Sequence, residues 1–248
     1  MQDNTTYSIA EAYDFCKNIA TAHYENFPVA SLLLPKNIRK YFYAIYAFAR
    51  TADDIADELT LTTDADTAAK ELNAFRKQLQ DVYNNEALFN PVFIALADTI
   101  HSKNIPIQPF ESLLDAFYSD IFFQGIETLE QLHSYCELSA NPVGELLLYL
   151  FGEHNEQNLL YSNDICTALQ IINHLQDIEK DIARSRCYIP NDLLMNADMA
   201  TAKKELIAIA NGLMLNGRKL FPNIHNLRFK IELRLIWHGG MAALKKLK

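Results

Sequence analysis

Polar and apolar positions in residues 46–58 alternate with the period of an α-helix. Asp53 and Asp57 lie four residues apart, so their carboxylates project from the same face one turn apart. Carboxylates that face inward without a cation repel each other and are costly to desolvate. A divalent metal ion would remove that cost. The apolar residues expected to turn this face inward are Phe42, Ile45, Ala49, Ala52 and Ala56.

A second acidic stripe occurs far along the chain, in residues 170–181. Asn173, Asp177 and Asp181 follow one another at four-residue intervals and form one polar stripe over two helical turns. Two such stripes on apolar helices predict a cavity whose facing walls bind metal. Mg²⁺ prefers carboxylate oxygens and is usually completed by substrate phosphates, so we expect a diphosphate to be bound and ionised there. The apolar residues expected beside this stripe are Ile171, Ile172, Leu175, Ile178 and Ile182.

Each of these features has a simpler interpretation. A single acid pair at this spacing is usually a solvated helix face, although a solvated face has no need of an apolar border. Arg50, one turn before Asp53, could pair with an aspartate or reach a phosphate oxygen. Arg184 and Arg186 could clamp a diphosphate or cap a helix C-terminus. The aromatic residues of 110–123 could stabilise a cation or simply fill the core.

The remaining pattern predicts an all-α chain. Ser8 with Glu11, and Thr128 with Gln131, match capping boxes that open helices. Pro142 and Gly144 should kink the helix that contains them and allow close approach of a ligand or a neighbour. Gly239-Gly240 should break the last helix. The expected helices besides that of Asp53 and Asp57 cover residues 8–22, 64–83, 91–102, 110–123, 128–151, 162–183, 200–216 and 223–237.

Composition narrows the class of protein. The 248 residues are 50% hydrophobic and 21% charged, with 7 Gly and 8 Pro, which favours one large helical domain over a sandwich or barrel. The net charge of -9 argues against nucleic-acid binding, which needs a basic surface. No signal peptide or membrane span is apparent, and four scattered cysteines fit buried thiols in a reducing cytoplasm.

The chain resembles the squalene/phytoene synthase family over nearly its whole length. The resemblance is carried by Tyr46-Ala47-Phe48-Ala49-Arg50 running into Asp53-Asp54-Ile55-Ala56-Asp57, and by residues 170–181 followed by Arg186-Cys187-Tyr188-Ile189-Pro190. Within the family, residues 23–31 and Ser139-Ala140-Asn141-Pro142-Val143-Gly144 look most like the bacterial hydroxysqualene synthase branch of hopanoid biosynthesis. Relatives usually continue through a further C-terminal helix that closes the pocket, and this sequence ends at Lys248.

The resemblance implies a fold and a set of site residues. The fold is a helical isoprenoid-synthase bundle with a central cavity. His23 and Asn26 belong to a loop that closes over the phosphates, and Tyr135 matches a tyrosine near the reacting carbons. Mg²⁺ ions, about two or three of them, would be held on the diphosphate. Their matching ligands are Asp53, Asp57, Asn173, Asp177 and Asp181. The residues expected to contact the diphosphate or line the pocket are Tyr46, Arg50, Gln170, Arg186 and Tyr188.

The implied substrate in this branch is presqualene diphosphate, a prenyl diphosphate. Its cation would rearrange and be captured by water to give hydroxysqualene and pyrophosphate, with no NADPH. One alternative is head-to-head condensation of farnesyl diphosphate to presqualene diphosphate, squalene or phytoene. Another is a non-catalytic scaffold with the same fold. Greasy substrates also suggest peripheral contact with the inner face of the membrane, for which residues 244–248 are a candidate.

Overall fold

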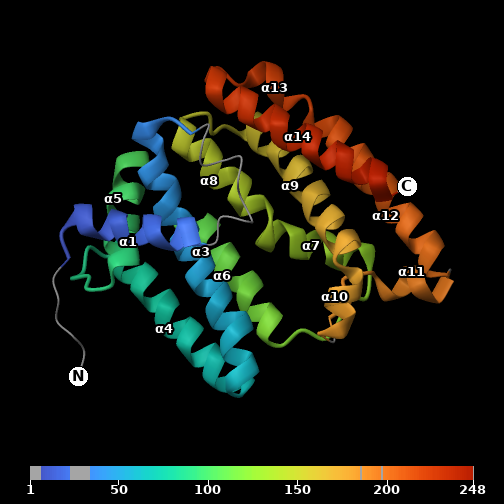
Figure 1. Cartoon of the computed structure of the whole chain (residues 1–248), viewed down its shortest axis with the longest axis horizontal. Coiled ribbons are helices and arrows are strands. Elements are labelled where there is room, and N and C mark those ends of the chain that lie inside the picture. The colour runs from blue at the N-terminus through green and yellow to red at the C-terminus, as the bar shows by residue number, and fades with distance from the viewer. Residues whose placement is uncertain (1–6, 23–33, 185, 197, 248) are drawn as a thin grey trace. The chain divides into compact units, whose positions relative to one another are not determined.

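The computed structural model describes residues 7–22, 34–184, 186–196 and 198–247, and within these ranges it contains helices and no strand (Figure 1). The predicted all-α fold is therefore confirmed. The chain forms two compact units, of which unit 1 ends at Phe122 and also includes Tyr149–Gly152. Unit 2 comprises Phe123–Leu148 and Glu153–Lys248.

The helices of unit 1 are α1 (Ile9–Ala22), α3 (Lys36–Thr62), α4 (Ala65–Tyr83), α5 (Pro91–Lys103) and α6 (Gln108–Ile121). A phenylalanine from each of the last four helices meets the others at the centre of this unit. Phe48 has its ring centroid 5.3 Å from those of Phe75 and Phe110, and Phe75 lies 4.6 Å from Phe93. All four rings are at most 4% exposed. Offset and edge-on aromatic pairs of this kind favour one arrangement of the four helices.

Local capping explains where two of these helices begin. The Ser8 hydroxyl accepts from the Glu11 N–H, while the Glu11 carboxylate accepts from the Ser8 N–H at 2.8 Å, as the capping box predicts. The Asp64 carboxylate accepts from the Thr67 N–H at 2.7 Å and begins α4. The helical boundaries expected in unit 1 are confirmed to within about two residues, the usual uncertainty of a helix end.

In unit 2, the long helix α9 (Glu156–Gln176) packs against α7 (Leu129–Ser139), α12 (Met199–Gly217) and α14 (Leu227–Leu247). The shorter helices are α10 (Ile178–Ala183), α11 (Asn191–Asn196) and α13 (Leu220–Asn223). Neither α11 nor α13 was expected from the sequence, because segments of six and four residues are too short to show a helical period. Helix α8 (Asn141–Phe151) begins in unit 2 and ends in unit 1.

The kink expected inside residues 128–151 is instead a break between α7 and α8 at Ala140. Pro142 lies in the first turn of α8, where a missing N–H interrupts no helical hydrogen bond. Gly144 lies against α9, so an added Cβ would meet the Ser162 hydroxyl and stand 2.6 Å from the Cys166 sulfur. The close approach predicted for this glycine is therefore to a neighbouring helix.

Residues 162–183 are also not one helix. Helix α9 begins earlier, where the Asn155 side chain accepts from the Asn158 N–H, and it ends at Gln176. Asp177 has φ −100° and ψ 10° and joins α9 to α10. The Asp177 N–H still donates to Asn173, and the Asp181 N–H to Asp177, so the acidic stripe continues across the joint. Ile182, expected to pack beside the stripe, is 52% exposed.

The prediction that Gly239-Gly240 breaks the last helix is wrong, because α14 continues to Leu247. A Cβ on Gly240 would stand 2.7 Å from Met214 Cε and 2.8 Å from Leu169 Cδ2, whereas one on Gly239 would meet nothing within 4 Å. Gly240 therefore lets α14 approach α12 and α9 closely. Leu244, expected at an exposed end of the chain, is 1% exposed.

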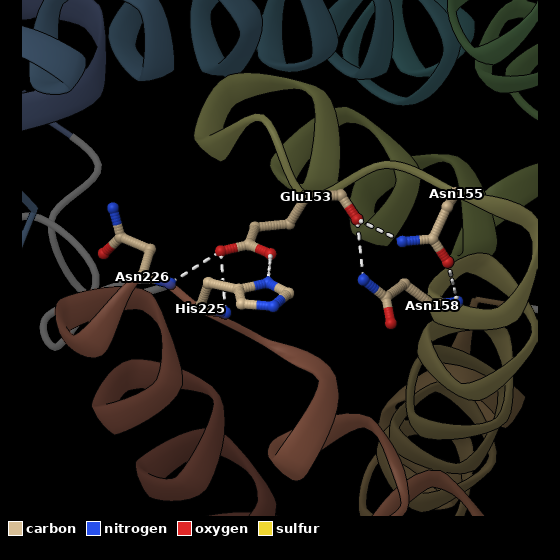
Figure 2. Close-up of polar contacts among 5 residues, drawn as sticks. All are labelled: Glu153, Asn155, Asn158, His225 and Asn226. Carbon is tan, nitrogen blue, oxygen red and sulfur yellow. Dashed lines mark hydrogen bonds and ion pairs between the residues drawn. The ribbon is translucent and has the colours of Figure 1, made fainter.

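Glu153 anchors the start of α14, and Figure 2 shows its contacts. Its Oε1 accepts from the backbone N–H groups of His225 at 2.9 Å and Asn226 at 2.6 Å, while Oε2 lies 3.2 Å from His225 Nδ1. The Asn158 side chain donates to the Glu153 backbone carbonyl at 2.7 Å. The Asn226 side chain then accepts from Phe229 N–H and caps α14. A charged group buried to this degree is stable only when it is hydrogen-bonded in this way.

The four cysteines are free: Cys16 and Cys136 are buried, and Cys166 and Cys187 are half-buried. Burial raises the pKa of the Cys16 and Cys136 thiols to about 12 and that of Cys166 to about 11, so these three stay protonated. Of the helices that the structure describes, none has both the length and the apolar character needed to cross a membrane.

Candidate functional site

The first acid cluster lies on α3, in unit 1. Arg50 Nη1 is 3.3 Å from Asp53 Oδ2, and Arg50 Nη2 is 2.5 Å from Asp54 Oδ1. Of the two interpretations of Arg50, pairing with aspartate is the one that this structure shows. A guanidinium has five N–H donors, so pairing with carboxylates does not by itself exclude contact with an anion.

The acid face of α3 lies at the edge of the core and is only partly buried. Ala52 and Ala56 are buried, as expected, whereas Phe42, Ile45 and Ala49 are only half-buried. The Asp53 side chain is 40% exposed. The prediction that this whole face turns inward is therefore wrong, because the core face of α3 is formed instead by Tyr43, Ala44, Ala47, Phe48, Ala52 and Ala56. A half-exposed carboxylate is little desolvated and stays accessible to a hydrated ion.

Tyr46 lies one turn before Arg50 on the same helix, with its ring stacked on Phe42 at a centroid distance of 6.3 Å and an interplanar angle of 28°. The structure thus places Tyr46, Arg50, Asp53 and Asp57 along one stretch of α3. Asp54 was not singled out from the sequence, although its position four residues after Arg50 is the usual spacing of a helical ion pair.

The second acid cluster lies where α9 meets α10, in unit 2. Asn173 is exposed, and Asp177 and Asp181 are half-exposed. Burial, together with the negative charge of Asp177, raises the pKa of Asp181, while Arg186, Arg184 and Lys180 oppose the rise. The Lys180 ammonium lies 2.8 Å from Asp177 Oδ1. A bound cation would relieve the repulsion between the two carboxylates.

Arg184 and Arg186 follow the acidic stripe directly. Arg184 is the C-terminal capping residue of α10, and the Arg186 N–H donates to the Asp181 carbonyl at 2.8 Å. This bond holds the Arg186 backbone close to Asp181. The helix-capping interpretation therefore describes Arg184, whereas Arg186 lies close to Asp181 and its contact with a diphosphate stays a prediction.

An aromatic wall adjoins this second cluster, and we define it as Phe123, Tyr135, His174 and Tyr188. The His174 and Tyr188 rings stack at 3.9 Å with an interplanar angle of 17°. The Tyr188 ring also lies 5.4 Å from Tyr135 and 4.7 Å from Phe123. The sequence predicted Tyr135 and Tyr188 as pocket residues, and the structure brings their rings together.

His174 was not among the site residues expected from the sequence, and its environment shows why it belongs to the wall. Gln170 Nε2 lies 3.3 Å from His174 Nε2. Burial lowers the pKa of His174 to about 4, partly offset by the charge of Asp177, so the ring is neutral at neutral pH. A neutral imidazole stacked on tyrosine behaves as an aromatic side chain. The sequence signal that could have identified His174 as a site residue is its position four residues after Gln170, which places both side chains on one helix face.

The donor set fits Mg²⁺ bound together with a diphosphate. Within the described ranges, no group of three or more His, Cys, Asp and Glu side chains is placed to hold a metal ion. Mg²⁺ commonly takes one or two protein carboxylates and fills its other positions with water and substrate phosphates. Asp53 with Asp57, and Asp177 with Asp181, each offer two carboxylates about one turn apart. His23 and Asn26 lie outside the described residues.

Comparison with known proteins gives a consistent result. The family model described as "Squalene/phytoene synthase" matches residues 20–248. Hydroxysqualene synthase of Zymomonas mobilis is 38% identical over 182 residues, which are 72% of this chain and 58% of that protein. Hydroxysqualene synthase of Rhodopseudomonas palustris is 33% identical over 230 residues, with 86% and 75% covered.

Two further matches broaden the picture. Phytoene synthase of Mycobacterium bovis is 33% identical over 187 residues, which are 75% of this chain and 60% of that protein. The chain thus spans less than two thirds of the Zymomonas and Mycobacterium proteins. The crystal structure of squalene synthase HpnC from Alicyclobacillus acidocaldarius superposes with a TM-score of 0.89 at 34% identity, covering 96% of this chain and 94% of that one.

Proposed function

We propose that this chain, which belongs to the squalene/phytoene synthase family, converts presqualene diphosphate into hydroxysqualene and pyrophosphate. The family makes it an isoprenoid synthase. The observation that carries the finer assignment is the similarity to hydroxysqualene synthases, which in two cases covers 86% of the chain. Both predicted acid clusters lie within the matched residues 20–248.

In the proposed reaction, the bond between the substrate's cyclopropylcarbinyl carbon and the diphosphate oxygen breaks, and the electron pair leaves with pyrophosphate. Water then adds to the rearranged cation and releases one proton, so one substrate and one water give one alcohol and one pyrophosphate. Mg²⁺ supplies charge stabilisation for the leaving group. Asp53, Asp57, Asp177 and Asp181 would provide carboxylate ligands and Asn173 an amide oxygen.

The remaining predicted residues act on either side of the broken bond. We assign Arg50 and Arg186 to the diphosphate, since guanidinium groups bind its oxygens bidentately. Tyr46 and Gln170 would orient the substrate near the acids, as would His23 and Asn26. The aromatic wall offers ring faces and a neutral imidazole to the cation, which stabilises charge without supplying a strong nucleophile. Tyr135 is the residue we place nearest the reacting carbons.

Head-to-head condensation of farnesyl diphosphate is the second candidate. It is favoured by the phytoene synthase of Mycobacterium bovis, which is 33% identical to this chain. The acid clusters serve either reaction, because both begin with loss of a diphosphate. The absence of an NADPH requirement is part of the leading proposal, and a product reduced only when NADPH is added would contradict it. We place the reaction in the cytoplasm, where four free thiols stay reduced.

The test is product identification after incubation with Mg²⁺ and either presqualene diphosphate or farnesyl diphosphate. We expect hydroxysqualene from the first substrate. Asp53→Asn and Asp177→Asn should each lower kcat at least ~100-fold, because each removes a charged metal ligand. Asp14→Asn, at an exposed position on α1, is the control and should leave the rate unchanged.

The melting temperatures of the variants should stay close to that of the unsubstituted protein, since Asp53 and Asp177 are half-exposed. Calorimetric titration of Mg²⁺ in the presence of pyrophosphate gives a readout that does not depend on turnover. Full activity in either Asn variant would place the metal ions elsewhere. Unchanged presqualene diphosphate, with conversion of farnesyl diphosphate, would favour the second candidate.

A further inference from the structure

The outward face of α14 carries three large aliphatic side chains. Leu227 is 69% exposed, Ile231 44% and Leu235 45%. They recur every four residues and therefore form one stripe along the N-terminal half of the helix. Single exposed leucines are common on protein surfaces, whereas an aligned set on one helix is less so.

These residues are not needed for the core of unit 2. The opposite face of α14 already buries Phe229, Leu233, Trp237 and Leu244, each at most 7% exposed. Trp237 Nε1 donates to the Met214 carbonyl at 2.7 Å, which fixes the helix against α12. The helix is thus held from one side, and its aliphatic stripe is exposed on the other side.

The charges on this helix have one sign on the exposed side. Arg228, Arg234, Lys245 and Lys246 are all exposed. Along α14, whose full length is described, the one acidic residue is Glu232, and it is 4% exposed. The whole chain has a net charge of -9, so an acid-free helix face with four cations departs from the rest of the molecule. We refer to Leu227, Ile231, Leu235, Arg228, Arg234, Lys245 and Lys246 as the α14 outer face.

A hollow with basic lining lies where α14 ends. Leu247 forms part of it together with Lys203, Lys204, Ile207 and Asn211 of α12, and its volume is about 550 Å³. Two ammonium groups beside aliphatic carbon suit an anionic headgroup attached to an acyl chain. The hollow therefore adds positive charge at the C-terminal end of the same helix.

We propose that the α14 outer face docks the protein onto an anionic lipid bilayer, as a peripheral contact and not as a span. Aliphatic side chains can enter the headgroup boundary while neighbouring arginines and lysines bind lipid phosphates. Charge complementarity favours an anionic bilayer over a second copy of the chain as the partner of this face, because the cations and the aliphatic stripe share one helix about 30 Å long. Of the segment 244–248 expected from the sequence, this docking surface keeps Lys245 and Lys246, whereas Leu244 is buried.

The test is sedimentation of the full chain with vesicles of phosphatidylcholine alone or with about one third phosphatidylglycerol. The protein should bind the anionic vesicles and bind them less at high salt, since screening weakens the attraction. Arg228→Gln with Arg234→Gln should weaken binding more than tenfold, from roughly fivefold per charge. Ile231→Gln with Leu235→Gln should weaken it as well, and at all salt concentrations.

Matched controls lie elsewhere on the surface. Leu160→Gln changes an aliphatic residue of α9 that is 56% exposed, and Lys17→Gln with Lys70→Gln removes two exposed cations from α1 and α4. Neither control should alter vesicle binding. If the variant with Ile231→Gln and Leu235→Gln loses helical circular dichroism, the single variant Ile231→Gln replaces it in the binding test.

Three results would overturn the proposal. These are no binding to anionic vesicles, equal binding to neutral vesicles, or unchanged binding by both α14 variants. Sedimentation without lipid tests the alternative that a second copy of the chain covers this face. Concentration-dependent self-association that the α14 variants abolish would make the face an interface between copies. None of these readouts uses turnover, so failure here leaves the proposed reaction untouched, and the reverse also holds.

Discussion

Glu232 is a buried carboxyl group whose ionisation should weaken unit 2. It is 4% exposed on the inner side of α14, and its Oε1 has no hydrogen-bond partner among the described residues. Burial raises its pKa from 4.5 to about 7. The folded protein therefore holds this proton more tightly than the unfolded chain does, and folding is penalised wherever the unfolded carboxyl group ionises first.

The sign and size follow from the two pKa values. Below about pH 4.5 both states are protonated, and Glu232 makes no pH-dependent contribution. As pH rises towards 7, the unfolded state loses the proton and the free energy of unfolding falls. Each pH unit between the two pKa values is worth about 1.4 kcal/mol, so the penalty approaches about 3 kcal/mol above pH 7. That value is an upper limit, because water can reach a partly opened helix.

Glu232→Gln removes the ionisation and keeps the shape. The free energy of unfolding of this variant, minus that of the unsubstituted protein, should rise by about 2–3 kcal/mol between pH 5 and pH 8. Urea unfolding followed by tryptophan fluorescence measures it in the relevant unit, because Trp237 is the single tryptophan and lies on the same helix. Glu205→Gln, at an exposed position on α12, is the control. A difference that stays constant within about 0.5 kcal/mol would refute the reasoning.

Two further predictions concern packing and anchoring in unit 2. Gly212→Ala should raise the free energy of unfolding by about 0.5–1 kcal/mol, since its Cβ meets nothing within 4 Å on α12. Gly217→Ala should lower it by about 1–3 kcal/mol, because its Cβ would stand 2.5 Å from Ile165 Cγ1. Glu153→Ala should lower it by about 2–4 kcal/mol, as it leaves the His225 and Asn226 N–H groups without their acceptor. Urea unfolding followed by Trp237 measures all three, and equal effects of the two glycine substitutions would contradict the packing argument.

Helical spacing alone was enough to predict which acid residues lie close together, whereas their role as metal ligands stays a prediction. Asp53 and Asp57 share a face of α3, and the Asp181 N–H donates to the Asp177 carbonyl across the joint between α9 and α10, so each pair is about one turn apart. The spacing could not show how deeply these side chains are buried. The periodicity around Asp53 suggested an inward face, but a helix of small and aromatic residues can bury either of two adjoining faces, and α3 buries the one with Phe48.

Helix ends were predicted well where a side chain caps them and poorly where neighbouring helices decide. The Asp64 and Ser8 caps act within one turn of the chain, so they are legible in the sequence. The joint at Asp177 contains no proline or glycine from which it could have been predicted. It separates α9, which has buried residues from Asn158 to Leu175, from α10, which buries one residue, Ile178. The break therefore reflects where the core of the unit ends.

At Gly239-Gly240 the error was the opposite one: local helix propensity predicted a break that the structure does not contain. Each glycine within a helix costs about 1 kcal/mol relative to alanine, which favours a break in an isolated peptide. In unit 2, Gly240 lets Met214 and Leu169 approach the α14 backbone, and continuation of the helix buries Leu244 beyond it. Burying one leucine is worth about 1.5–3 kcal/mol, enough to offset the propensity of both glycines. The same close approach fixes the orientation of α14, so that its buried side is filled and its aliphatic stripe and cations face outward.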